Sequence, residues 1–233
     1  MLYFRLNILN LMKKYLLGTS LLLSSIATVP VMADDDFYLS IGYGVTYPND
    51  VESDYVIGNT STTYEITEET DNPGMLSVGF GKSFDNDFRV EFNFSKATAT
   101  ADSFTVTSAS SGVAESISDY LEYDVTNYMV YGLKDFSNES KFTPYAGVGI
   151  GFASINANDA TATIAGTAYS FTFEEESVLS FAFKGGVGYK ITEQTTLFTE
   201  LGYTNLASFR SKGGVNYDSN NLIGLNAGVK FSF

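Results

Sequence analysis

Large apolar residues alternate with small or polar ones along most of the chain after residue 37. In the clearest segment, Phe88, Val90, Phe92 and Phe94 alternate with Arg89, Glu91, Asn93 and Ser95. Successive side chains of a β-strand point to opposite faces, so a period of two predicts a strand. We expect eight such strands, near residues 38–47, 76–84, 88–95, 121–134, 145–152, 179–189, 197–204 and 223–233. The pattern therefore predicts an all-β protein.

One face of each predicted strand carries Phe, Tyr, Leu and Val, and the other carries Gly, Ser and a few charges. Eight large apolar faces would not fit inside one small barrel, but on its outside they would form a band in contact with lipid. We therefore expect a closed antiparallel transmembrane β-barrel of about eight strands rather than a soluble β-sandwich. In strand 121–134 the face expected to contact lipid carries Tyr123, Val125, Met129, Tyr131 and Leu133. Asn127 is an exception on this face, so a bulge or a register error is expected near it.

The predicted connections alternate in length, which supports a membrane barrel independently. Those near 85–87, 137–139 and 192–194 are tight, whereas those near 48–73, 98–120, 155–177 and 207–220 are long. Outer-membrane barrels combine short periplasmic turns with longer extracellular loops. With both termini on the short-turn side the number of strands must be even, and eight satisfies this. Lys82, expected close to the short-turn rim, is the one charge expected to face lipid.

Residues 1–33 have the layout of a secretory signal peptide. Lys13 and Lys14 precede an apolar run of about fifteen residues, Pro30 interrupts it, and small or modest side chains lead up to Ala33. The run is shorter than the roughly twenty apolar residues that a spanning helix needs. We therefore expect cleavage after Ala33, which leaves residues 34–233 as the barrel domain. Met12 is an alternative start, because it directly precedes the two lysines.

Composition narrows the classes of function. The chain has no Cys, no His, 27 acidic and 13 basic residues, and a formal net charge of −14. Nucleic-acid binding needs basic patches, so nucleic acid is not an expected partner. Most hydrolytic and metal-dependent mechanisms near neutral pH use His. We therefore expect no enzymatic activity, and hence no catalytic residue, metal site or cofactor.

Several glycine and aromatic positions resemble the opacity-protein and OmpA-like family of small outer-membrane barrels. They are Pro144 and Tyr145 with Gly147, Gly149 and Gly151, then Gly186–Tyr189, Leu197, Glu200 and Tyr203, and finally the alternation of Val229, Phe231 and Phe233. The resemblance extends over about residues 37–233. It implies a structural, adhesive or surface-antigen role in the outer membrane and no reaction. It also implies that Phe231 and Phe233 belong to the signal that the barrel-assembly machinery recognises.

Charged residues on the inward faces are the candidate functional site. Arg89 and Glu91 of the third strand, Lys184 of the sixth and Glu200 of the seventh are expected to face the lumen. An isolated buried charge is very costly, so we expect opposite charges to pair, with Lys184 as the first choice for Glu91 and Arg89 as the second. Eight strands leave an interior just wide enough for side chains to fill. We therefore favour a plug over a gate or a narrow ion path.

Acidic residues of the long loops form a second candidate group. They are Asp50, Glu52, Asp54, Glu65, Glu68, Glu69 and Asp71 in the first long loop, and Glu174–Glu176 in the third. Carboxylates can bind Ca²⁺ or Mg²⁺. The loops show no ordered spacing of ligands, however, and solvated loop surface is the favoured interpretation.

Together the patterns predict a structural or surface-interaction protein of the outer membrane, of the surface-antigen or adhesion type, with a plugged lumen. The alternative is a small porin-like channel or a transporter of apolar molecules. The expected partners are outer-membrane lipids, the barrel-assembly machinery and an extracellular ligand contacted through the loops. The protein is expected to be a monomer.

Overall fold

The computed structural model describes residues 37–56, 63–108, 114–158, 160–164, 167–171, 173–212 and 214–233. The predicted signal peptide and its cleavage site at Ala33 lie outside the described residues. Within them, no helix is long and apolar enough to cross a membrane.

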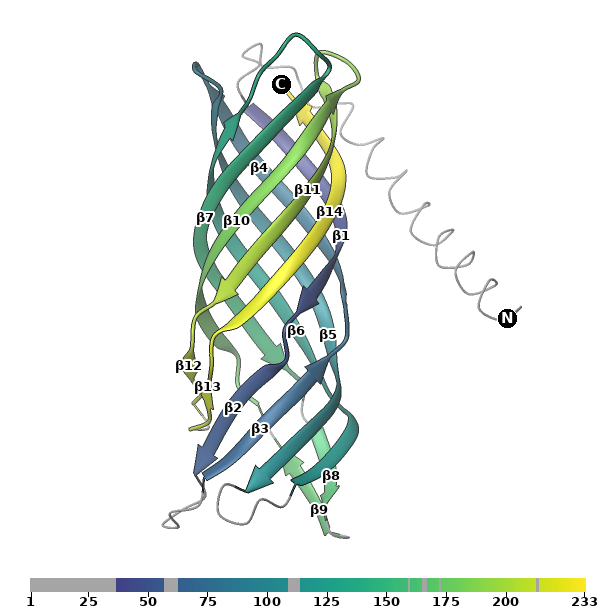
Figure 1. The fold of residues 1–233 in the computed structure, drawn as a ribbon, viewed down its shortest axis with the longest axis vertical. Coiled ribbons are helices and arrows are strands. Elements are labelled where there is room, and N and C mark those ends of the chain that lie inside the picture. The colour runs from purple at the N-terminus through teal and green to yellow at the C-terminus, as the bar shows by residue number, and fades with distance from the viewer. Residues whose placement is uncertain are drawn as a thin grey trace, which may run out of the picture. The chain divides into compact units, whose positions relative to one another are not determined.

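Eight antiparallel strands of the described residues close into a barrel (Figure 1). They are β1 (Phe37–Pro48), β4 (Gly74–Phe84), β5 (Phe88–Ser108), β6 (Ala114–Asp135), β7 (Phe142–Ala157), β10 (Glu176–Lys190), β11 (Thr195–Leu206) and β14 (Asn220–Ser232). Each pairs with the next in this order, and β14 pairs with β1, for example Ile41 with Val229. The all-β closed barrel predicted from the alternation is confirmed.

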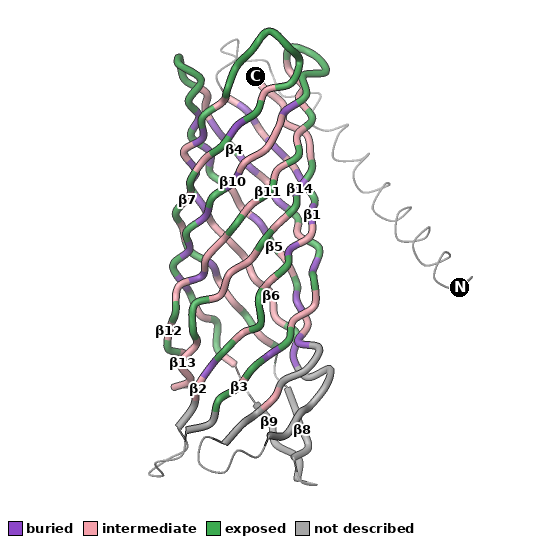
Figure 2. Tube along the Cα trace, in the orientation of Figure 1, coloured by how far each residue is buried: buried purple, intermediate pink, exposed green. Residues whose placement is uncertain are grey.

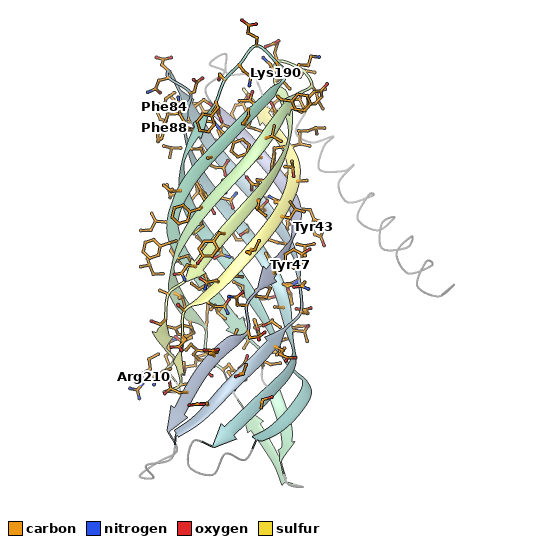
Figure 3. The ribbon with its side chains drawn as sticks, viewed as in Figure 1. Tyr43, Tyr47, Phe84, Phe88, Lys190 and Arg210 are labelled. Atoms are coloured by element: carbon orange, nitrogen blue, oxygen red, sulfur yellow. The ribbon has the colours of Figure 1, made fainter. Side chains whose placement is uncertain are left out.

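Buried and exposed positions alternate along the barrel strands (Figure 2). The outward residues are large and apolar: Phe80, Phe92, Val148, Ile150, Phe183, Leu201 and Leu225 are each between 49% and 59% exposed. Phe84 and Phe88 lie outside the barrel near the short-turn end, and Tyr43 and Tyr47 lie outside it further along the axis (Figure 3). An apolar band with aromatic residues toward its edges is the lipid-facing surface of an outer-membrane barrel.

Strand β6 corrects the predicted orientation of residues 121–134. Met129, Tyr131 and Leu133 are at most 8% exposed and face the lumen, while Val130, 48% exposed, faces outward. The whole face points inward, including Tyr123 and Val125. Asn127 lies on this same inward face, where a polar residue is not an exception. The prediction was wrong because it assumed that large side chains always face lipid.

Glycines on the next strand make room for these large inward side chains. Met129, Tyr131 and Leu133 of β6 lie directly opposite Gly151, Gly149 and Gly147 of β7. A Cβ atom at Gly149 would overlap the ring of Tyr131. The lumen is therefore filled by pairing a large residue on one strand with a glycine on its neighbour, which is how a close-packed interior is built at this width.

Paired strands also continue through much of the predicted long loops (Figure 1). Strands β5 and β6 pair well beyond the ends of β1 and β4, and β3 (Thr63–Thr70) continues along β5 where β4 leaves it. Next to β3 lie β2 (Val51–Val56), β13 (Asn216–Tyr217) and β12 (Phe209–Arg210), in that order. We call this sheet of β12, β13, β2, β3 and the outer parts of β5 and β6 the extension. The strands β8 (Ala160–Ile164) and β9 (Thr167–Phe171) form a separate hairpin.

The opposite end of the barrel has the predicted short turns. In the turn between β4 and β5, Asn86 and Asp87 have φ of 76° and 58°. Asn and Asp adopt this left-handed conformation more readily than most residues, and tight hairpin turns require it. Short turns at one end and a longer extension at the other identify the extracellular end as the one that carries the extension.

Candidate functional site

Charged side chains meet across the lumen near the short-turn end. Lys184 Nζ of β10 lies 2.8 Å from Glu91 Oε1 of β5 and 3.4 Å from Glu200 Oε2 of β11. The three side chains are 7%, 5% and 13% exposed. Strands β5 and β10 are separated by β6 and β7 in the barrel, so the Glu91–Lys184 contact spans the lumen. Such a buried, charge-assisted contact resists separation, because breaking it leaves a charge without a partner.

A second ion pair lies beside the first and is connected to it through a tyrosine. Arg89 Nε and Nη2 donate to both carboxylate oxygens of Asp135 at 2.8–3.0 Å. Arg89 Nη1 also donates to the Tyr38 hydroxyl at 3.1 Å, and this hydroxyl donates to Glu91 Oε2 at 3.0 Å. The two ion pairs therefore form one network, which we call the lumen cluster.

Aromatic and amide side chains satisfy the remaining polar atoms of the lumen cluster. The Tyr145 hydroxyl donates to Glu200 Oε2 at 3.0 Å, and Asn226 Nδ2 donates to Glu200 Oε1 at 3.2 Å. Lys184 Nζ lies 4.2 Å from the centre of the Tyr131 ring, within the range of a cation–π contact. A third cation, Lys230 of β14, lies 5.3 Å from the Tyr38 ring. The charges described in this part of the lumen balance, since there are three carboxylates (Glu91, Glu200 and Asp135) and three cations (Arg89, Lys184 and Lys230).

A cavity of about 250 Å³ lies on the short-turn side of the lumen cluster. Its lining includes Arg89, Glu91, Lys184 and Glu200, together with residues of the short-turn rim such as Lys190 and Glu193. The lumen cluster is thus the floor of a chamber that faces the periplasmic side.

Apolar side chains fill the lumen at the extracellular side. Ala153, Val178 and Leu206 are buried, and Val125, Ile155, Ala207, Phe209 and Leu222 pack against them. Between this group and the lumen cluster lie polar residues such as Ser180 and Asn127, whose Oγ and Oδ1 atoms have no hydrogen-bond partner within the described residues. Polar atoms in such a position are usually satisfied by buried water.

The structure places all four predicted lumen charges on inward faces. It brings Glu91, Lys184 and Glu200 into direct contact, whereas Arg89 pairs with Asp135 and reaches Glu91 only through Tyr38. Sequence reasoning missed Asp135, because Asp135 lies on the face of β6 that the prediction had assigned to lipid. The alternation placed Tyr38, Tyr145 and Lys230 on inward faces. It did not predict which residues they contact, because these contacts depend on the register of the strands.

The other predicted residues lie outside the lumen. Phe231 of β14 is opposite Leu39 and Thr195 on the lipid face, and Phe233 follows the last strand residue. Lys82 also lies on the lipid face, with Nζ 4.7 Å from the Phe37 ring and 5.9 Å from the Phe84 ring. Within the described residues, no group of three or more Asp or Glu side chains is arranged to hold a metal ion.

Comparison with known proteins identifies the family. A family model described as the outer membrane protein beta-barrel domain matches residues 19–231. A search of curated proteins gives no match. Solved structures that share the fold include OprG from Pseudomonas aeruginosa (16% identity, TM-score 0.57, 85% of this chain and 95% of that chain) and neisserial surface protein A (14%, 0.53, 84% and 97%). The outer membrane protease OmpT from Escherichia coli is also similar (10%, 0.55, 88% and 99%).

At these identities the structural likeness shows the fold alone, and a fold found in both a surface protein and a protease does not assign a function. The family match, in contrast, extends over most of the chain and agrees with the closed barrel and its apolar outer band. The chain belongs to the outer membrane protein β-barrel domain family, and the protein is located in the outer membrane.

Proposed function

We propose that the protein is a structural or surface-interaction barrel, of the surface-antigen or adhesion type, whose lumen does not conduct. The observation that carries this proposal is the Glu91–Lys184 contact across the lumen, at 2.8 Å, with a second carboxylate, Glu200, on the same lysine. Because the contact spans the lumen, an ion or a solute that takes this path must separate the two side chains.

The energy of that separation supports a plug. Removing one partner of a buried ion pair costs about 3–5 kcal/mol in proteins. The neighbouring cavity has room for water, which would lower this figure, whereas the contacts of Tyr38, Tyr145 and Tyr131 with the charges would oppose the separation. The extension then provides the surface through which the protein meets its surroundings, since exposed segments beyond a rigid barrel are the usual place for recognition.

Swelling of proteoliposomes tests the proposal. Vesicles that contain the refolded mature barrel are placed in isosmotic solutions of small sugars and amino acids, and light scattering reports solute entry. We expect swelling no faster than in protein-free vesicles, and a general porin serves as the positive control. Faster swelling that depends on the protein would refute the closed lumen.

One observation favours the alternative, a transporter of apolar molecules. The extracellular part of the lumen is lined by Ala153, Val178 and Leu206 rather than by polar residues. An apolar solute would enter such a region more easily than a polar one. Uptake of a radiolabelled alkane by cells with and without the protein separates the two functions, because a plugged surface barrel leaves uptake unchanged.

A further inference from the structure

The extracellular end of the barrel is strongly acidic, whereas the rest of the barrel is balanced. Segments 49–73, 98–124, 154–177 and 207–220 contain 17 Asp and Glu residues, against only Arg210 and Lys212 as basic residues. These segments form the extension and the connections around it. Acidity alone does not define a site, but it attracts cations to this end of the protein.

Within the extension, one of these carboxylates is buried. Glu68 of β3 is 8% exposed, whereas Glu65 on the opposite face of the same strand is exposed. The register partners of Glu68 are Val51 on β2 and Phe104 on β5, neither of which carries a charge. A buried carboxyl in this position either stays neutral or takes a cationic partner, because burial of an unpaired charge is expensive.

The residues that the structure describes supply no cation for Glu68. No Lys or Arg in the described residues forms an ion pair or hydrogen bond with it, and the stretches between 57 and 213 that the structure does not describe contain no Lys or Arg. Its electrostatic neighbour is Tyr123 of β6, which also interacts with Asp71 and donates a hydrogen bond to Thr70. The described groups that face Glu68 are therefore neutral or acidic.

A second buried polar atom on the same face as Glu68 has no hydrogen bond within the described residues. Ser53 of β2 is 7% exposed, and its Oγ has no hydrogen bond within the described residues. Ser53 lies opposite Ile66, two residues before Glu68 on the same face, so Ser53 and Glu68 are diagonal neighbours across β2 and β3. Among the described residues, the Glu68 carboxylate thus has no cationic partner and the Ser53 hydroxyl has no hydrogen bond, and both lie on the same face of the extension.

We propose that Glu68 and Ser53 form a binding site for a primary ammonium group at the extracellular end of the barrel. An ammonium carries one positive charge and three hydrogen-bond donors, so it can pair with the carboxylate and donate to the hydroxyl at the same time. The inference rests on the proposed surface-interaction function and names the chemistry of its ligand. The ammonium group belongs either to a free amine or to a lysine side chain of a protein.

A divalent metal ion fits this site less well. Ca²⁺ needs six to eight oxygen ligands and Mg²⁺ needs octahedral geometry. Glu68 is one carboxylate, and within the described residues no group of three or more acidic side chains surrounds a common point. A single carboxylate beside a hydroxyl is enough for a monovalent organic cation.

The acidity of Glu68 makes binding depend on pH. Burial raises the pKa of the Glu68 carboxyl to about 7. Below that pH the carboxyl is neutral and attracts a cation weakly, and above it the carboxylate is charged. Binding should therefore strengthen as the pH rises from about 6 to about 8, and a bound ammonium should lower the pKa of Glu68.

Titration of the mature barrel in detergent micelles by two-dimensional NMR tests the proposal. The probes are n-butylammonium and the capped tripeptide acetyl-Gly-Lys-Gly-amide, added at about 0.3 M NaCl so that attraction to the general acidic surface is screened. The variants are E68Q, which removes the buried charge, and E65Q, which removes an exposed charge from the same strand. Heat-modifiable migration in SDS gels shows that each variant folds.

We expect saturable shifts of amide signals in β2 and β3, with affinity at least about tenfold lower in E68Q and unchanged in E65Q. S53A should weaken binding by a smaller factor. Equal binding by E68Q and wild type, equal losses in E68Q and E65Q, or no saturable shift between pH 6 and 8 would each overturn the site. Similar affinity for both probes indicates a free amine, and tighter binding of the peptide indicates a lysine side chain. Vesicle swelling does not depend on Glu68, so failure of this site leaves the closed lumen standing.

Discussion

At the scale of single residues, the lumen is held together by contacts between distant parts of the chain. Glu91 and Lys184 are 93 positions apart in sequence and lie on strands that are not neighbours, yet their atoms meet at 2.8 Å. Tyr38 joins this pair to Arg89 and Asp135. Several large inward rings rest against a glycine on the next strand, as Tyr38 does against Gly81.

The coupling between Glu91 and Lys184 is the first prediction. A double-mutant cycle with E91A and K184A should give a coupling energy above about 0.5 kcal/mol, because the pair is buried and hydrogen-bonded. The cycle of E91A with R89A should give a smaller value, since Tyr38 lies between the two side chains. Urea unfolding in lipid vesicles, followed by tyrosine fluorescence, measures the free energy of unfolding.

The exposed pair Lys190–Glu193 provides the matched control for this cycle. Its side chains are 48% and 92% exposed, so water screens their attraction. We expect a coupling there of no more than about 0.5 kcal/mol. Additive effects at Glu91 and Lys184, no larger than those of the control pair, would mean that the lumen charges are merely solvated.

The stability of the extension should depend on pH through Glu68. The pKa of Glu68 is raised by burial to about 7 in the folded protein from 4.5. At a pH between these values the folded state keeps a proton on Glu68 that the unfolded segment has lost. The contribution of Glu68 to stability is therefore largest below pH 4.5 and falls as the pH rises to about 7. The loss is on the order of 3 kcal/mol at most.

Hydrogen exchange of β3 amides, measured from pH 4 to 8 and corrected for intrinsic rates, checks this dependence. In E68Q the protection should no longer fall with pH, because the amide does not ionise. Protection in wild type that stays constant across this range, or a slope that survives in E68Q, would contradict the assignment to Glu68.

At the scale of strands, the alternation of residues predicted most of the barrel. The positions of β1, β4, β5, β7, β10, β11 and β14 and their outward faces follow from a period of two, because lipid selects one face of each strand. The inward charges followed from the same rule. The face of β6 was assigned wrongly, since both of its faces contain large residues and only the glycines opposite Met129, Tyr131 and Leu133 on β7 show which face is inside.

Contacts between strands were harder to predict than the strands. Asp135 could not be paired with Arg89 while β6 was inverted, and the link through Tyr38 depends on the register of β1, β4 and β5. The extension was predicted as loop because both faces of its strands carry polar residues, which weakens the alternation. Backbone hydrogen bonds between strands, which the residue pattern does not encode, extend β5 and β6 beyond the membrane band.

The fit between β6 and β7 gives a third prediction. A Cβ atom at Gly151 would overlap the Tyr128 carbonyl oxygen, so G151A should force the two strands apart and lower the free energy of unfolding by about 1–3 kcal/mol. At Gly202, another inward glycine, the nearest atom to a new Cβ is the Phe183 carbonyl oxygen at 3.8 Å. G202A is therefore the matched control and should be close to wild type in urea unfolding. Equal losses in both variants would contradict a specific fit between β6 and β7.

The end of β14 gives a fourth prediction. If Phe233 belongs to the signal read by the barrel-assembly machinery, its deletion should reduce the heat-modifiable folded band in the outer membrane much more than it reduces refolding in detergent. F136A, which removes an exposed aromatic ring from a short turn, is the control. Wild-type amounts of folded protein after the deletion would refute a role of Phe233 in assembly.

At the scale of the whole molecule, the barrel divides into zones along its axis. The short-turn side holds a cavity above paired charges, the middle of the lumen is polar, and the extracellular side is apolar within and acidic in the extension. The apolar outer band contacts lipid and anchors the protein, and it consists of other residues than those that fill the lumen. In the proposed function, this separation would let the extension bind a ligand while the lumen cluster keeps the barrel closed.

Single-channel recording in planar lipid bilayers tests the closed lumen most directly. Wild-type protein, shown to be folded by heat-modifiable migration, should insert without steady openings, whereas K184A should admit ions because the contact between β5 and β10 is lost. Steady openings of wild type on the nanosiemens scale, of the same size as those of K184A, would contradict the account.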